Sequence, residues 1–263
     1  MVDTNGDPIG IVSEKDVMRF ILTDNSRRGL DEMRAHEAMS RRVLTIKPEA
    51  PITDVAEVMI RENISSLVVN SDRFEGIVTK SDIVNYFGLT KRRTHPGGQF
   101  MTPNPITVKP SQSIFSTIAS MTQNRISRVI VVDQNRVVQG IVTLTDFTML
   151  LGYSLINLSK KLTAADARTP AADFLKRAET IGLTAKDFMT HDPVTISQNL
   201  DLAEAARLMT KHDISGLPVT DNSAKLIGIV SKTDITQAVA YEKKANQIQF
   251  SLIRRSPRAT IRL

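Results

Sequence analysis

Short apolar runs alternate with helical patterns along the chain, and this alternation occurs several times in the same order. Apolar residues fall at helical spacing from Ile52 to Ile60, and a short run rich in apolar residues follows over Ile64–Val69. The same order recurs from Ile114 to Val132 and from Leu200 to Val219. Helical spacing predicts an amphipathic helix, and a short β-branched run predicts a buried strand. The pattern therefore predicts a repeated helix-then-strand unit.

One seven-residue motif follows these strands and occurs four times. It consists of a glycine, two β-branched residues, a hydroxyl residue, two variable positions and an aspartate, at residues 10–16, 76–82, 140–146 and 228–234. A β-branched pair after a turn glycine is typical of the end of a buried strand. A hydroxyl residue three positions before an acid is typical of a helix start. The motif predicts a strand that leads directly into a helix, four times over.

The repeats divide the chain into four units. The first is expected to begin in its middle, because the spacing from Asp3 to Gly10 equals that from Asp133 to Gly140. The predicted boundaries are a partial first unit at 1–24, a second unit at 36–88, a linker at 89–98, a third unit at 99–153, a helical linker at 154–185 (with its helix around 171–181), a fourth unit at 186–240 and a basic tail at 241–263.

Composition narrows the class of protein. The chain has 263 residues, of which 41% are hydrophobic and 24% charged, as in soluble globular proteins. Cysteine is absent, which excludes disulfides, thiolate nucleophiles and Cys-based metal sites. No apolar run approaches the roughly 18 residues of a membrane helix, and the first residues do not form a signal peptide. We therefore expect a cytoplasmic protein with no membrane partner.

The net charge of +6 has two interpretations. One is a solvated basic surface with affinity for small anions, and the other is nucleic-acid binding. Basic residues gather at 91–93 and in the tail, at Arg254, Arg255, Arg258 and Arg262. Aromatic residues make up only 5% and tryptophan is absent, which argues against a base-stacking platform. Nucleic acid stays an alternative partner.

The sequence contains no pattern typical of a catalytic centre. The four histidines, His36, His95, His191 and His212, lack metal-ligand spacing, and no nucleophile is paired with a base. We expect a protein that is not an enzyme, with no metal and no catalytic cofactor. Four methionines at helical spacing are expected to fill the core: Met18, Met59, Met121 and Met209.

The hydroxyl residue and the aspartate of the motif, such as Thr143 and Asp146, allow two interpretations. They can form a capping box, in which the acid reaches back to the amide of the cap residue. They can equally face a ligand, because a helix N-terminus attracts polar groups and a carboxylate can accept both hydrogen bonds of a ribose diol. The residues alone do not separate the two interpretations.

Three short signatures, in a fixed order, resemble the cystathionine-β-synthase (CBS) domain. They are Met-Thr-x-x-Pro-x-Thr-Val from Met101, Ile-Ser-x-x-x-Val from Ile126, and the seven-residue motif at 140–146. The resemblance covers nearly the whole chain outside the linkers and the tail. It implies an α/β (α+β) fold of β-α-β-β-α units, with units one and two in one tandem module and units three and four in another. The arrangement is similar to that of four-unit prokaryotic proteins and, more distantly, of the gamma subunit of AMP-activated kinase.

The resemblance also implies a ligand, namely AMP, ADP, ATP or S-adenosylmethionine, held in clefts between paired units. It assigns the ribose to Asp16, Asp82, Asp146 and Asp234, and ribose or phosphate to Ser13, Thr79, Thr143 and Ser231. It assigns adenine to Thr45, Thr107 and Thr195, and to the turns at Ile64, Ile126 and Ile214. In the third unit Arg125 and Arg128 flank Ile126, where the family often places a basic residue, and Arg128 is expected to meet phosphate. The second unit has Ser65 and Ser66 there, which favours a nucleoside-like ligand.

We therefore expect a regulatory, ligand-sensing protein, acting as a homodimer of CBS modules on an effector protein that is not identified. Two alternatives stay open: a nucleic-acid-associated regulator that uses the basic linker and tail, and a structural scaffold that binds no ligand.

Overall fold

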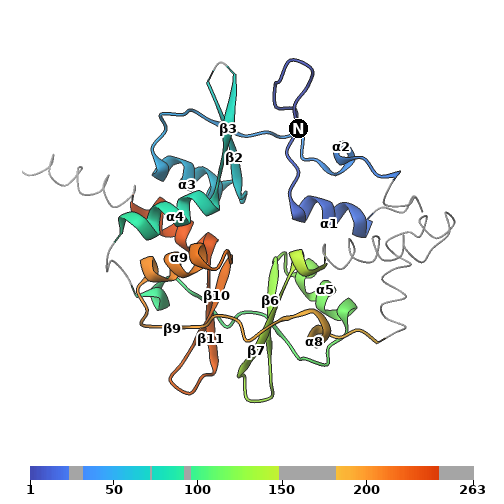
Figure 1. Ribbon diagram of the computed structural model, residues 1–263, viewed down its shortest axis with the longest axis vertical. Helices are drawn as coiled ribbons and strands as arrows, with labels where there is room; N and C mark the ends of the chain where they lie inside the picture. Colours follow the sequence, from blue (N-terminus) through green and yellow to red (C-terminus); the bar gives the residue numbers. More distant parts are fainter. Residues whose placement is uncertain (24–31, 72, 92–95, 148–181, 243–263) are drawn as a thin grey trace, which may run out of the picture. The chain divides into compact units, whose positions relative to one another are not determined.

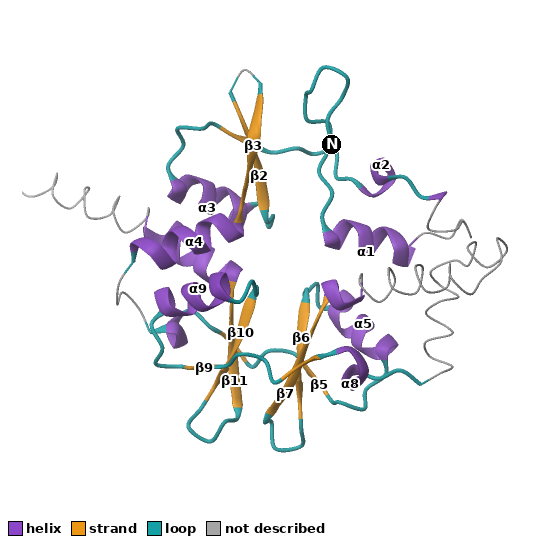
Figure 2. Cartoon of the chain, in the orientation of Figure 1, coloured by secondary structure: helices purple, strands orange, loops and turns teal. Residues whose placement is uncertain are grey.

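The computed structural model describes residues 1–23, 32–71, 73–91, 96–147 and 182–242 (Figures 1 and 2). The chain forms two compact units assembled from separate stretches. Unit 1 comprises Met1–Val43, Pro103–Ile196 and Pro218–Ile229, and unit 2 comprises Leu44–Thr102, Ser197–Leu217 and Val230–Leu263. The repeats predicted from the sequence are present, but each compact unit combines stretches of more than one repeat.

Three repeats contain a similar series of elements, although the described part of the second lacks a counterpart of the opening strands of the other two. The second consists of α2 (Ala35–Ala38), β1 (Thr45–Ile46), α3 (Ile52–Arg61), β2 (Ser66–Asn70), β3 (Phe74–Thr79) and α4 (Lys80–Thr90). The third consists of η2 (Gly97–Gln99), β4 (Thr102–Pro103), β5 (Thr107–Val108), α5 (Ile114–Gln123), β6 (Arg128–Val132), β7 (Val138–Thr143) and a helix that begins with residues 144–147. The fourth consists of α8 (Ala185–Phe188), β8 (Thr190–His191), β9 (Ile196–Ser197), α9 (Leu202–Lys211), β10 (Gly216–Thr220), β11 (Leu226–Ser231) and helical residues 232–242.

The first repeat contributes α1 (Glu14–Thr23), preceded by an isolated bridge between Val2 and Pro8. Most of the predicted linker at 154–185 and of the tail, with the helix expected around 171–181, lies outside the described residues. The α/β fold class expected from the sequence is confirmed.

The sheets that contain β2 and β6 are both mixed. In the third repeat β5 pairs in parallel with β6, and β6 pairs antiparallel with β7, with a register shift between Val131 and Val132. The second repeat has the same order, β1-β2-β3, with its register shift between Val69 and Asn70. A parallel neighbour requires a crossover, and α3 and α5 supply it in their repeats.

The opening strand of one repeat joins the sheet of another. The strand β8 opens the fourth repeat but pairs with β7 of the third, with Gly140 opposite His191. In the other sheet β4 opens the third repeat and lies beside β11 of the fourth. Ser40 and Ile11 form an equivalent bridge between the second and first repeats.

This exchange explains the glycine of the motif and corrects one prediction. Gly140 was expected in a turn, but it lies inside β7. A Cβ atom on Gly140 would overlap the Met189 side chain and would lie 3.0 Å from the carbonyl oxygen of Thr190. Gly10 has the same relation to Met39 and Ser40. The glycine is therefore needed, in these two copies, because the opening strand of the next repeat crosses it closely.

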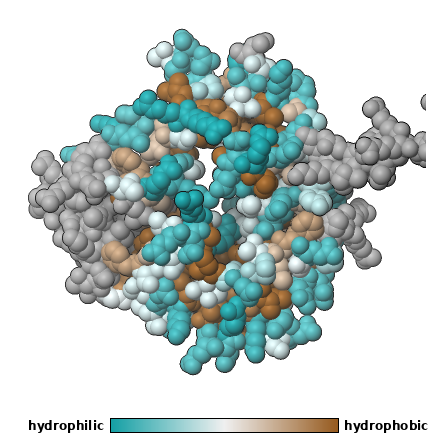
Figure 3. Space-filling model, turned by 180° about the vertical axis from the view of Figure 1, so that it is seen from behind, coloured by the Kyte–Doolittle hydropathy of each residue, from teal (hydrophilic) through white to brown (hydrophobic). Residues whose placement is uncertain are grey.

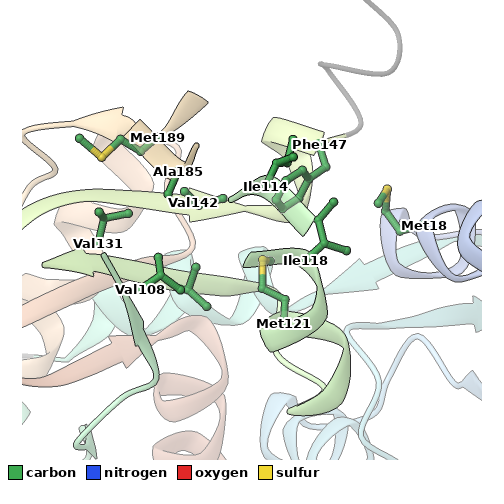
Figure 4. Packing of buried hydrophobic residues seen from close by; sticks show 11 residues of the cluster. Met18, Val108, Ile114, Ile118, Met121, Val131, Val142, Phe147, Ala185 and Met189 are labelled. Atoms are coloured by element: carbon green, nitrogen blue, oxygen red, sulfur yellow. The ribbon is translucent and has the colours of Figure 1, made fainter. Parts of the chain in front are cut away.

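The core of unit 1 is built around α5 and the sheet that contains β6 and β7 (Figure 4). Ile114 on α5, Val131 on β6 and Val142 on β7 are almost fully buried, and Met18 of α1 joins the same cluster. The other three methionines expected in the core, Met59, Met121 and Met209, are also buried, so this prediction is confirmed. A second cluster joins Ile130 and Val132 to Leu226 and Ile229.

In unit 2 the helices α4 and α9 pack closely against each other. Arg207 of α9 donates through its Nη1 to the carbonyl oxygen of Gly88, at 2.8 Å. The described end of the predicted linker is also tied to this unit, because the Gly97 and Gly98 amides donate to the carbonyls of Leu200 and Gln198.

Candidate functional site

The hydroxyl residue of each motif copy precedes a helix, and the aspartate reaches back to it. Asp146 Oδ2 accepts from the Thr143 amide at 2.6 Å and from the Thr143 hydroxyl at 2.8 Å. The corresponding distances are both 2.7 Å for Asp82 and Thr79, and 2.7 and 2.6 Å for Asp234 and Ser231. Asp16 makes the same two contacts with Ser13. The aspartate's half of the capping box, its contact with the amide of the cap residue, is therefore present in all four copies.

The Ile-Ser pair of each complete repeat is tied to the motif through the backbone. The amides of Lys80, Leu144 and Lys232 donate to the carbonyls of Ser65, Ser127 and Ser215 at 2.9, 3.0 and 3.2 Å. In the same turns the amides of Ile64, Ile126 and Ile214 donate to the carbonyls of Met59, Met121 and Met209. The predicted adenine-facing isoleucines are thus brought beside the start of each motif helix.

The predicted residues of the third repeat lie on adjacent strands. Arg128 begins β6 and faces Thr143 across the β6–β7 pair, while Thr107 begins β5 and pairs with Ile130. The equivalent predicted threonines, Thr45 and Thr195, lie at the start of β1 and directly before β9. Arg125, the other predicted basic residue, is exposed and has a φ of 54°, as Asn63 and Asp213 do in their repeats. Its position is a left-handed turn after a helix.

The second carboxylate oxygen differs among the four copies. Asp16 Oδ1 accepts from Arg19 at 2.8 Å, and Asp234 Oδ1 lies 3.4 Å from the Thr102 hydroxyl. Within the described part of the chain, the hydrogen bonds of Asp82 and Asp146 all involve Oδ2. An oxygen that the cap does not use can accept hydrogen bonds from a ligand, so the capping contacts do not exclude a binding role.

Burial distinguishes Asp234 from the other aspartates. Its exposed fraction is 8%, whereas Asp82 is exposed and Asp16 and Asp146 are half-buried. Burial raises the pKa of Asp234 through desolvation, although hydrogen bonds from Ser231 and Thr102 act in the opposite direction. A buried carboxylate with a raised pKa is typical of a binding or catalytic site.

Asp187 shows that the capping box alone does not cause this shift. It accepts from the Thr184 amide and hydroxyl at 2.7 and 2.8 Å, the same contacts as in the motif, but it lies on the surface. Those two hydrogen bonds lower the pKa of Asp187. Asp234 and Asp187 therefore share one local geometry, and their pKa values move in opposite directions because only Asp234 is buried.

This shift predicts a dependence of stability on pH. The pKa of Asp234 is higher in the folded than in the unfolded chain, so its contribution to stability is present below about pH 4 and is lost as the pH rises through the folded pKa. Replacing Asp234 with asparagine removes this loss. We expect the free energy of unfolding of Asp234→Asn, relative to that of the natural chain, to increase from pH 4 to pH 7 in urea titrations. A constant difference between the two proteins would show that Asp234 does not titrate abnormally.

Two kinds of residue at these sites escaped the sequence analysis. Thr102 reaches Asp234 across 132 positions of the sequence, because β4 joins the sheet of the fourth repeat. Lys80 and Lys232 lie at the variable positions of two motif copies and contact the other copy. The Met-Thr signature was a signal for Thr102, but it did not indicate which repeat the threonine would face.

The predicted basic regions contribute little to the described structure. Lys91 forms an ion pair with Glu242 at 2.9 Å, while residues 92–95 and the arginines of the tail lie outside the described residues. No group of three or more His, Asp or Glu in the described ranges is arranged to hold a metal ion. In the same part of the chain, none of the helices has both the length and the apolar character that crossing a membrane requires.

Comparison with known proteins identifies the repeats. The family model of the CBS domain matches residues 35–88, 98–153 and 185–241, more than half of the chain. The protein MJ1404 of Methanocaldococcus jannaschii is 27% identical over 92% of the chain, which spans 53% of that protein. The chloroplastic CBS domain-containing protein CBSX2 of Arabidopsis thaliana is 28% identical over 57% of the chain, with 66% of CBSX2 covered. The chain thus spans about half to two thirds of the length of these two relatives.

The fold also has a close structural counterpart. The crystal structure of MJ1225 from Methanocaldococcus jannaschii matches 90% of the chain and 86% of that protein with a TM-score of 0.75, at 21% sequence identity. At this identity the match establishes the fold alone.

Proposed function

The chain belongs to the CBS domain family, and on this premise we propose that it is a non-enzymatic regulatory protein that binds adenosine-containing ligands at the four motif helices. The ligand class comprises AMP, ADP, ATP and S-adenosylmethionine. The aspartate of each motif would accept the two ribose hydroxyls, and the capping hydroxyl would contact ribose or phosphate.

Asp234 is the observation that carries this proposal. Its carboxylate is almost fully buried, and burial raises its pKa, so the folded protein holds the ionised form at a cost. Two hydroxyls of a ribose are donors that stabilise an ionised carboxylate. A ligand would therefore relieve a cost that a purely structural helix cap, such as exposed Asp187, does not carry.

A sensor requires a ligand that binds two arrangements of the protein with different affinity. The strands β4 and β11 and the helix at residues 232–242 converge at Asp234, so occupancy would favour the arrangement in which they are held together. We infer that the response passes to a second copy of the chain or to an effector protein.

Calorimetric titration with adenosine, AMP, ATP and S-adenosylmethionine tests the proposal, with Asp234→Asn as the variant. Asparagine keeps one oxygen for the cap of Ser231 and replaces the other with an amide that cannot accept from ribose. Hydrogen bonds to charged groups contribute about 1.5–3 kcal/mol each, so affinity should fall by about 100-fold at this site.

Asp187→Asn is the matched control, because it changes the same residue type in the same capping geometry outside the motif. It should leave ligand affinity unchanged. Equal losses in the two variants would show that only helix capping was disturbed. If none of the four ligands binds to the folded protein, the proposal is rejected in favour of a structural scaffold.

A further inference from the structure

The second and fourth motif copies contact each other through the positions between their hydroxyl residue and their aspartate. Lys80 Nζ donates to Thr233 Oγ1 at 3.1 Å, and Lys232 Nζ donates to Ser81 Oγ at 2.9 Å. All four residues belong to unit 2. Thr233 directly precedes Asp234, and Ser81 directly precedes Asp82. Each lysine therefore starts in one motif copy and contacts the residue that directly precedes the aspartate of the other copy.

The first and third copies make the equivalent contact with the opposite charge. The Thr145 hydroxyl lies 3.1 Å from both carboxylate oxygens of Glu14. Thr145 occupies the position of Thr233, and Glu14 occupies the position of Lys80. A contact between motif copies is thus present in both pairs, with a lysine in one pair and a glutamate in the other.

The strand positions show a complementary difference. In the third repeat Arg128 faces Thr143, so a cation is present on the repeat's own sheet. Ser66 faces Thr79 at the same position of the second repeat, and Gly216 begins the equivalent strand of the fourth. The second and fourth repeats lack a cation at this strand position. Instead, the motif of each repeat is contacted by a lysine of the other repeat.

We propose that Lys80 and Lys232 select phosphate-bearing ligands, with Lys232 serving the site of Asp82 and Lys80 serving the site of Asp234. This inference rests on the proposed function and deepens it. An ammonium group beside a helix N-terminus adds to the positive potential that attracts an anion. A phosphate oxygen that replaces the neutral hydroxyl as acceptor carries negative charge, so its hydrogen bond with the ammonium group is stronger than the present one. Ligand at one site would then engage a residue of the other repeat, which couples the two sites.

The test compares AMP with adenosine, which differ only in the phosphate. Lys80→Met and Lys232→Met, alone and together, remove the charge and keep most of the aliphatic side chain. We expect the double variant to bind AMP roughly tenfold or more weakly in calorimetric titrations, while its affinity for adenosine stays unchanged. Unchanged adenosine binding also shows that the variant is folded. Lys109→Met is the control, because it makes the same charge change at an exposed lysine outside the motif.

The remaining outcomes separate this inference from the proposed function. If the double variant loses affinity for AMP and adenosine equally, the lysines only hold the two helices together and the inference is wrong. If the natural chain binds adenosine but shows no preference for AMP, the inference is wrong and the proposed function stands. If neither compound nor S-adenosylmethionine binds, both fail.

Discussion

Replacement of Gly140 by valine is expected to lower the free energy of unfolding by about 3 kcal/mol, because the added side chain has no room. A Cβ atom at Gly140 would lie 2.7 Å from Met189 Cγ and 3.0 Å from the carbonyl oxygen of Thr190, and it would overlap the Met189 sulfur. Met189 can move only by disturbing the core, since its exposed fraction is 8%. The Thr190 carbonyl belongs to β8 and cannot move without breaking the pairing with β7. Urea unfolding monitored by circular dichroism measures the change.

Gly76→Val is the control for this prediction. Gly76 occupies the same position of the motif inside β3, but a Cβ atom there would have no atom within 4 Å. Valine has a higher strand propensity than glycine. The free energy of unfolding should therefore change by no more than about 1 kcal/mol, and the substitution can be stabilising. Equal destabilisation by the two substitutions would show that the glycine is required by the motif itself and not by the crossing strand.

The comparison of these glycines shows how much the sequence could predict. The repeated pattern predicted the elements of the fold, because strands and helix starts depend on residues close together in the chain. The boundaries moved by a few residues: the strand expected from Ile64 begins at Ser66, and the helix expected from Leu200 begins at Leu202. The role of Gly140 could not be predicted, because it depends on a strand that starts fifty residues later, at Thr190.

The same reason limits the prediction of the candidate site. The four aspartates and their capping partners were visible in the sequence, and all four make the expected contacts. Their environments differ although their motifs match, since Asp234 is buried and Asp82 is exposed. Burial depends on what packs over the carboxylate, and for Asp234 this includes Thr102 from a different repeat. The pairing of Lys80 with Thr233 is equally invisible, because the two residues are 153 positions apart.

Phe147 connects the third motif to the core, and its replacement by alanine should have the largest effect on stability. Its exposed fraction is 2%, and it directly follows Asp146 on the motif helix. Its ring lies 5.2 Å from that of Phe188 in α8, at an interplanar angle of 55°, within the cluster that contains Ile114 and Ile118 (Figure 4). Removal of a buried phenylalanine side chain leaves a cavity and costs about 4 kcal/mol. The aromatic pair adds to this loss, because tilted rings at this distance attract each other.

Urea unfolding of Phe147→Ala should therefore show a much lower midpoint, with Phe147→Leu between the variant and the natural chain. Phe74→Ala is the control, since Phe74 is 40% exposed and its loss should cost less than about 1 kcal/mol. Hydrophobic residues at the surface, seen as separate brown areas in Figure 3, contribute little in this way because they remain in contact with water. If Phe147→Ala were as stable as Phe74→Ala, the motif helix would not depend on the core. Asp146 would then have to be held in place by its capping contacts with Thr143 alone.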